Sequence, residues 1–288
     1  MKKLFSKSRP NPTDIKIGIA LGGGGARGFC HIPVLQTLDD LGIRPSHISG
    51  TSMGAIVGAI YASGTSPSEI KQIIDGMLIY KGESLKDILQ KRGLRKWFDL
   101  IDPNFFKKGG VIKGNKIVEF LHEIIGVDSF EELGIPLTIV ATDFHTGEEV
   151  IFNSGPLMPA VRASMSLPGL FEPVRDNGRL LIDGGVVNPV PHDLLLDTDF
   201  VIAVDVSDLP QKTGQVPGVT DALMGAVEIM GRQIGDKRRA VYPPDIFLRP
   251  NFEGVEMTDF HRAEKIFKDA EPICEQLKEE LSGKLQMN

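Results

Sequence analysis

The stretch GIALGGGGARGF, residues 18–29, closes an apolar run and opens a glycine-rich loop. The run DIKIGIAL (14–21) is rich in residues that favour strands, so it predicts the first strand. After the loop, apolar side chains recur at helical spacing until Gly42. A strand, a glycine loop and a helix in this order indicate an α/β fold. They also place exposed backbone amides where an anion can bind.

Gly23-x-Gly25-x-x-Gly28 has the spacing of a dinucleotide-binding loop. That function also needs an acidic residue about 20 residues later, at the end of the second strand, to hold the ribose hydroxyls. The second predicted strand ends instead in ISGTSMG (48–54), with a serine between glycines. The sequence therefore disfavours a nucleotide-binding oxidoreductase, and a thermal shift with NAD(P) would revive that alternative.

The rest of the chain alternates predicted strands and helices. A capping box, Ser66 with Glu69, and Pro67 at the first helical position predict a helix start. Strand-forming runs are IPLTIVATDFHTGEEVIFNSG (135–155), GRLLID (178–183), DFVIAVDVS (199–207) and PDIFLRP (244–250). We therefore expect an α/β fold of three layers with a largely parallel central sheet.

Composition bounds the classes of function. The chain has 288 residues, 41% apolar and 24% charged, as in ordinary globular proteins. A net charge of −6 argues against nucleic acid as a partner. No apolar run is long enough to span a membrane, and MKKLFSKSRPNP (1–12) lacks the apolar core of a secretory signal. We therefore expect a cytoplasmic protein in which Cys30 and Cys274 are buried thiols.

The domain organisation expected is a flexible tail at 1–13 and one domain at 14–288. Within it, residues 79–114 break the periodicity. Ten Lys or Arg and four Asp or Glu lie between Lys81 and Lys116, a local net charge of +6, together with the only tryptophan, Trp97. Two interpretations stay open: an insertion packed on the domain, or an access flap in weak peripheral contact with an anionic membrane surface. No pattern indicates an oligomeric state.

Gly50-Thr51-Ser52-Met53-Gly54 matches G-x-S-x-G. In this pattern a nucleophile sits on a sharp turn between strand and helix, and the flanking glycines let the two elements approach. The turn would expose the Ser52 hydroxyl at a helix N-terminus, where developing negative charge is favoured. The alternative is that Ser52 merely caps the helix.

Acyl transfer at Ser52 would need amides for an oxyanion and a base. The consecutive glycines Gly22, Gly23, Gly24 and Gly25 could supply the amides, because they follow the neighbouring strand. Asp183 ends a predicted strand before two glycines and could take the serine proton directly, although it could also only cap the next turn. A Ser–Asp–His order with His192 or His261 fits on paper, but both histidines are expected to be ordinary surface or capping residues.

Three segments in this order, GGGGARG (22–28), GTSMG (50–54) and DGG (183–185), resemble the patatin-like phospholipase family. ASMSLPGLFEPV (163–174) and DGGVVNPVP (183–191) are also similar to family stretches. The resemblance covers roughly residues 15–205. Bacterial members and the catalytic domain of neuropathy target esterase are similar in particular.

The resemblance implies a serine acyl hydrolase that cleaves carboxylic esters of lipids, phospholipids or lysophospholipids, with no cofactor and no metal. It implies Ser52 as nucleophile, Asp183 as base and the amides of Gly22–Gly25 as oxyanion hole. Arg27 would attract an anionic head group or anchor the loop. Further expected substrate-binding residues are Met53, Ser166 and Pro168. The alternative is a low-turnover regulatory or scaffolding protein on the same fold.

Overall fold

The computed structural model describes residues 15–77, 102, 110–210 and 216–285. The expected tail at 1–13 and nearly all of the segment 79–114 lie outside these residues. Ten strands occur in the described residues: β1 (Ile17–Leu21), β2 (His47–Thr51), β3 (Gly110–Ile112), β4 (Leu137–Asp143), β5 (Glu149–Phe152), β6 (Gly169–Phe171), β7 (Val174–Asp176), β8 (Arg179–Asp183), β9 (Phe200–Val204) and β10 (Ile246–Leu248).

Eight of these strands form the central sheet, in the order β10-β9-β1-β2-β4-β8-β7, with β5 paired to β4. The five strands from β10 to β4 are parallel, whereas β5, β7 and β8 are joined by antiparallel pairings. The short strands β3 and β6 form a separate parallel pair. The prediction of a largely parallel central sheet is confirmed.

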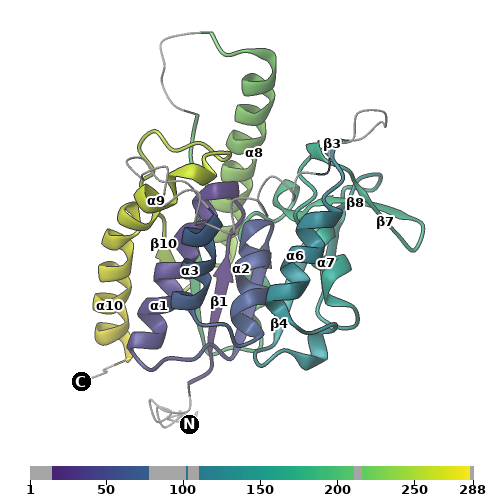
Figure 1. The fold of residues 1–288 in the computed structure, drawn as a ribbon. Helices are drawn as coiled ribbons and strands as arrows, with labels where there is room; N and C mark the ends of the chain where they lie inside the picture. Colours follow the sequence, from purple (N-terminus) through teal and green to yellow (C-terminus); the bar gives the residue numbers. More distant parts are fainter. Residues whose placement is uncertain (1–14, 78–101, 103–109, 211–215, 286–288) are drawn as a thin grey trace, which may run out of the picture.

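Helices cover both faces of this sheet (Figure 1). The helices are α1 (His31–Asp40), α2 (Met53–Ala62), α3 (Pro67–Met77), α6 (Asn115–Ile125), α7 (Leu157–Ser164), α8 (Val219–Val241), α9 (Ala263–Asp269) and α10 (Glu271–Leu285). On one face, α1, α2, α3, α6, α9 and α10 share a core with the sheet. The other face carries the chain that follows β8 and the second half of α8, where Arg239 lies over the Phe247 ring. The result is the three-layer α/β arrangement predicted.

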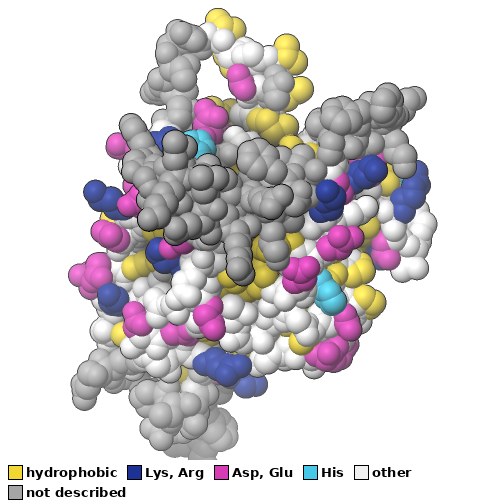
Figure 2. Space-filling view, viewed as in Figure 1, with side chains coloured by type: hydrophobic (Ala, Val, Ile, Leu, Met, Phe, Trp, Pro, Cys, Tyr) yellow, Lys and Arg dark blue, Asp and Glu magenta, His cyan; other side chains and the backbone are white. Residues whose placement is uncertain are grey.

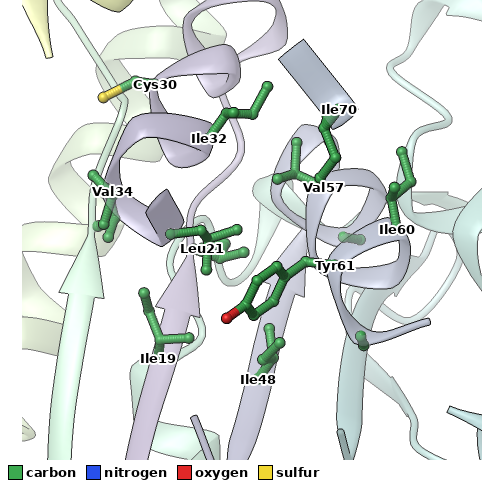
Figure 3. Close-up of a cluster of buried hydrophobic side chains, with 14 of the residues drawn as sticks. Ile19, Leu21, Cys30, Ile32, Val34, Ile48, Val57, Ile60, Tyr61 and Ile70 are labelled. Carbon is green, nitrogen blue, oxygen red and sulfur yellow. The ribbon is translucent and has the colours of Figure 1, made fainter. Parts of the chain in front are cut away.

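The main core lies between the sheet and the helices that follow β1 and β2 (Figure 3). Ile19 and Leu21 of β1 point into it, next to Ile48 of β2 and Val57 of α2. Ala20, between them, faces the second and smaller cluster on the opposite side. This alternation follows from the two-residue period of a strand, and both faces are apolar because both are covered.

The start of α3 has the predicted chemistry. The carboxylate of Glu69 accepts the backbone N–H of Ser66 at 2.9 Å, and the Ser66 hydroxyl accepts the N–H of Glu69 at 3.3 Å. Pro67 is the first helical residue, where its missing N–H leaves no unpaired donor. The capping box thus sets where α3 begins. Its apolar face packs Ile70 and Ile74 into the core.

Among the described residues, no helix is both long enough and apolar enough to cross a bilayer. Cys30 and Cys274 are buried and carry no disulfide, and burial raises the pKa of both thiols. The buried setting predicted for them is therefore confirmed.

Candidate active site

Ser52 occupies the turn between β2 and α2, and its backbone is strained. Its φ of 54° and ψ of −120° lie where a non-glycine residue is rarely found. Among the described residues only Asn177 shares a positive φ without being glycine. Such a conformation costs about 1–3 kcal/mol and persists where its surroundings impose it, most often at functional sites.

The glycines on either side of Ser52 explain how this turn closes. A Cβ on Gly50 would stand 2.7 Å from the carbonyl oxygen of Gly54 and 2.8 Å from the backbone of Ala55. A Cβ on Gly54 would overlap with the carbonyl of Leu21 in the neighbouring strand. Only hydrogen at both positions allows the helix to leave the sheet this sharply.

Asp183 reaches the same edge of the sheet from an antiparallel strand. The prediction that Asp183 lies at the carboxyl end of a strand is correct. This strand, β8, runs antiparallel to β4, and Asp183 lies opposite Ala141. Thr51 lies opposite Val140 on the other side of β4. The register therefore brings Asp183 level with the residue that follows Thr51, namely Ser52.

The side chains of Ser52 and Asp183 border the same cavity, and the N–H of Gly185 donates a hydrogen bond to the Asp183 carboxylate at 2.7 Å. Asp183 is only 4% exposed. Burial raises the pKa of Asp183 from 3.8 to about 6, and the nearby Ser52 hydroxyl and Gly185 N–H oppose this rise by stabilising the carboxylate. At neutral pH the Asp183 carboxyl is therefore mostly ionised.

The glycine loop lies beside this pair. A Cβ on Gly23 would be 3.1 Å from Cβ of Ser52. The amides of Gly22 and Gly23 are already used: they donate to the carbonyls of Val204 and Pro189, each at 2.9 Å. Within the described part of the chain, the amides of Gly24 and Gly25 have no hydrogen-bond acceptor. Of the four glycines named from the sequence, these two retain free donors.

Two buried side chains fix the loop. His31 Nε2 lies 2.7 Å from the carbonyl oxygen of Gly22, and desolvation lowers the pKa of His31 to about 4, so the ring is neutral and donates. Arg27 donates to the carbonyl of Val255 at 3.0 Å and to Glu228 at 2.6 Å. Arg27 is 3% exposed. Of its two predicted roles, these contacts are those of a loop anchor, although Arg27 also borders the cavity described next.

A cavity of about 450 Å³ opens from Ser52 and Asp183, within the size range of small-ligand sites. The loop residues Gly23, Gly24 and Gly25 border it. Its walls come mostly from aliphatic side chains of α2, α3 and α6. These are Ile56, Ile60, Ile70, Ile73, Ile74, Met77, Ile117, Leu121 and Ile124. A wall of this composition suits a hydrocarbon chain rather than a polar molecule.

The expected substrate-binding residues differ in their placement. Met53 lines the cavity, but among the described residues the wall after α7 is formed by Met165 and Leu167, not by Ser166 or Pro168. The hydroxyl of Ser166 donates to the carbonyl of Arg162 at 2.7 Å and accepts from its guanidinium at 2.6 Å. Ser166 is therefore turned back onto the preceding helical turn, which corrects its assignment to the wall.

The histidines considered from the sequence lie elsewhere. His192 Nδ1 contacts the carbonyl of Val190 at 2.8 Å, and His261 is an exposed side chain 3.9 Å from Asp259. In the described residues no hydrogen bond joins a histidine to Ser52 or Asp183. The same residues contain no group of three or more His, Cys, Asp or Glu side chains that could hold a metal ion.

Ser164 is a site residue that the sequence analysis missed. It is fully buried at the end of α7, and its hydroxyl oxygen accepts the backbone N–H of Ser52 at 2.8 Å. The bond fixes the orientation of the strained peptide that carries Ser52. Its only sequence signal was a serine two residues before Ser166 in the stretch ASMS (163–166).

We expect Ser164→Ala to lower kcat/KM for ester hydrolysis by about 10- to 100-fold, because a buried N–H without an acceptor costs about 1–3 kcal/mol. Ser164→Thr keeps a hydroxyl and should recover part of the rate. The matched control is Ser63→Ala, which removes a hydroxyl bonded to Ile60 at the other end of α2. Equal kinetics for Ser164→Ala and the parent would contradict the role of this hydroxyl.

The family model described as patatin-like phospholipase matches residues 19–196. An uncharacterized NTE family protein of Mycobacterium tuberculosis is 37% identical over 194 residues, 67% of this chain and 49% of that protein. A neuropathy target esterase of Drosophila melanogaster is 33% identical over 206 residues, 70% of this chain and 14% of that protein. The chain thus spans about half the length of the mycobacterial relative.

Among solved structures, VipD from Legionella pneumophila aligns with a TM-score of 0.49 at 16% identity, over 91% of this chain and 67% of that chain. ExoU of Pseudomonas aeruginosa, in complex with SpcU, aligns with a TM-score of 0.43 at 17% identity, over 94% of this chain and 52% of that chain. Neither likeness bears on activity. The family match, in contrast, extends over more than half of the chain and includes both Ser52 and Asp183. The chain therefore belongs to the patatin-like phospholipase family.

Proposed function

We propose that the chain is a serine acyl hydrolase that cleaves carboxylic esters of lipids through an acyl-enzyme on Ser52, with Asp183 as the base. The observation that carries this proposal is that Ser52, in a strained turn before a helix, and the buried carboxylate of Asp183 lie level in the sheet and border one largely aliphatic cavity. The substrates proposed are phospholipids or lysophospholipids, in line with the family's name and with an acyl-shaped cavity.

In the first step, Oγ of Ser52 attacks the ester carbonyl carbon while its proton passes to the Asp183 carboxylate. The carbonyl oxygen becomes an oxyanion. The free amides of Gly24 and Gly25 are the proposed donors to it, and the N-terminus of α2 adds partial positive charge. Each such donor is worth about 3–4 kcal/mol of transition-state stabilisation by analogy with oxyanion donors that have been removed by mutation.

Collapse of this intermediate breaks the bond to the alcohol oxygen, and protonated Asp183 gives its proton to the leaving alcohol. Water then attacks the acyl-enzyme, with Asp183 again accepting a proton, and the tetrahedral intermediate releases the fatty acid and restores the Ser52 hydroxyl. A base that must first accept and then return a proton works best with a pKa close to the operating pH, and burial moves Asp183 in that direction.

The test is fatty-acid release from diacyl and monoacyl glycerophospholipids in mixed micelles, followed by mass spectrometry. We expect release by the parent chain and none by Ser52→Ala. A parent chain that is folded but releases no fatty acid from either class would contradict the proposal and favour the regulatory alternative.

The pH profile should report Asp183. We expect kcat/KM to rise with pH and to level off above an apparent pKa of about 6, because the carboxylate must be ionised to accept the serine proton. A histidine base would produce a similar rise of kcat/KM with pH. The control is therefore His192→Asn, in which the rise should occur at the same pH. If the rise of kcat/KM with pH disappears in His192→Asn, the assignment of the apparent pKa to Asp183 is contradicted.

A further inference from the structure

The first half of α8 and the loop before it carry an unusual share of exposed apolar side chains. Of the twelve large hydrophobic residues that are exposed among the described residues, six lie between positions 209 and 230. They are Leu209, Val216, Val219, Leu223, Ile229 and Met230. We call these six residues the α8 patch. The others are scattered singly or in pairs over the chain, which is normal for a protein surface.

The α8 patch stands on a part of the molecule that projects from the main body. Figure 1 shows the N-terminal part of α8 extending beyond the ends of the other helices, and Figure 2 shows hydrophobic side chains gathered on this projection. Val216 is 94% exposed, Val219 81% and Leu223 60%. These three side chains are largely exposed and belong to none of the hydrophobic core clusters of the described chain.

The two faces of α8 have different surroundings. Val219, Leu223 and Met230 are spaced by four and seven residues, so they share one face of the helix. Glu228, Gly231 and Arg232 border the cavity, and Glu228 and Arg232 lie on roughly the opposite face of the helix. A single helix therefore joins an exposed apolar face to the wall of the cavity that opens at Ser52.

The same helix passes directly over the turn that holds the base. A Cβ on Gly231 would be 3.8 Å from the carbonyl oxygen of Gly185, whose N–H donates to Asp183. Val186 in this turn is 37% exposed and also borders the cavity. The α8 patch thus begins at Met230, next to the cavity-lining Gly231, and extends along the helix away from the cavity to Val219.

We propose that the α8 patch inserts into the surface of a lipid bilayer and places the cavity mouth against the acyl chains. The charge and the apolar character of the α8 patch favour a lipid bilayer as its partner. Between 209 and 230 the chain carries two acidic residues, Asp221 and Glu228, and one basic residue, Lys212, so attraction to anionic lipid does not explain this surface. Apolar side chains on a projecting helix enter an uncharged interface as well as a charged one. The inference rests on the proposed function, because a cavity for acyl chains needs access to a lipid phase.

This surface is different from the basic segment 79–114 considered in the sequence analysis. Binding through that segment would depend on anionic lipid and weaken in salt. Insertion of the α8 patch should occur on vesicles of phosphatidylcholine alone and should persist in high salt. The two modes of attachment therefore predict opposite dependence on lipid charge.

The experiment uses the full chain with Ser52→Ala, so that the vesicles stay intact, and measures co-sedimentation with phosphatidylcholine vesicles. We expect binding, and we expect the added pair Val219→Asp and Leu223→Asp to weaken partitioning by roughly 100-fold, about tenfold for each apolar side chain lost from the interface. The matched control is Leu196→Asp. Leu196 is 85% exposed and lies before β9, at the sheet edge opposite Ser52, so the control should bind like the parent.

Activity separates this inference from the proposed function. In the active chain, the pair Val219→Asp and Leu223→Asp should leave hydrolysis of a soluble short-chain ester unchanged and reduce hydrolysis of phospholipid in vesicles. An active site that cleaves no ester at all would contradict the proposed function but leave the vesicle result standing.

Three results would overturn the inference: no binding of the parent to phosphatidylcholine vesicles, equal binding by the double variant, or equal loss of binding in Leu196→Asp. A dimer in sedimentation velocity that the double variant dissociates, without vesicle binding, would assign the α8 patch to a second copy of the chain and also overturn it.

Discussion

Ser52→Ala is expected to lower kcat/KM for ester hydrolysis by about 10⁴-fold or more, because an acyl-enzyme cannot form without the hydroxyl. The fall should appear in kcat, since the cavity and the free amides of Gly24 and Gly25 remain to bind substrate. Steady-state kinetics on a soluble ester measures it. A loss of less than tenfold would mean that Ser52 is not the nucleophile.

Ser52→Gly provides a matched control for this result. It also lacks the hydroxyl and should be as inactive as Ser52→Ala, but glycine adopts a φ of 54° without strain. We therefore expect Ser52→Gly to have a free energy of unfolding about 1 kcal/mol above that of Ser52→Ala. Equal stability for the two variants would show that the turn relaxes when the hydroxyl is removed.

Asp183→Asn is expected to remove activity and to stabilise the fold at the same time. The amide cannot accept the serine proton, so we expect kcat to fall by about 10³-fold or more. The amide does not ionise either, and this has a second consequence. The folded protein must keep a charged carboxylate buried at neutral pH, whereas the variant need not.

The sign of the pH dependence follows from the raised pKa of Asp183. Below the unfolded pKa of 3.8 the carboxyl is protonated in both states and does not affect stability. As pH rises through the folded pKa of about 6, the free energy of unfolding falls by a total of about 3 kcal/mol, at 1.36 kcal/mol for each pKa unit. Asp183→Asn should therefore gain up to about 3 kcal/mol at pH 7, and nothing below about pH 4.

Urea denaturation at both pH values tests this expectation. The control is Asp176→Asn, which changes a part-exposed carboxylate paired with Arg179 at 2.9 Å. That control should give no comparable gain at pH 7, because its charge is solvated. If Asp183→Asn is less stable than the parent at neutral pH, the expectation that the buried charged carboxylate lowers the free energy of unfolding is contradicted.

The local parts of the site could be predicted from sequence. Gly50, Ser52 and Gly54 lie within five residues that close one turn, so their spacing alone indicates the geometry. The capping box at Ser66 was predictable for the same reason. Asp183 could be predicted because it ends a strand before two glycines. The direction of β8 could not be predicted from its own residues, because it depends on the pairing with β4.

The remaining contacts depend on tertiary structure. Ser164 bonds to Ser52 across 112 positions, and Arg27 bonds to Glu228 across 201. No short pattern relates residues so far apart. Ser166 was placed on the cavity wall because the stretch resembled the family, but its hydroxyl turns back to Arg162, and its neighbours Met165 and Leu167 form the wall. Likewise, the free amides could be assigned to Gly24 and Gly25 only once the partners of Gly22 and Gly23 were known.

The central claim, that Ser52 is a nucleophile activated by Asp183, is tested most directly by labelling with a fluorophosphonate and mapping the adduct by peptide mass spectrometry. We expect one adduct on the peptide that contains Ser52. We also expect no adduct in Ser52→Ala and much slower labelling in Asp183→Asn. An unlabelled parent chain, or an adduct on another residue that persists in Ser52→Ala, would contradict the claim.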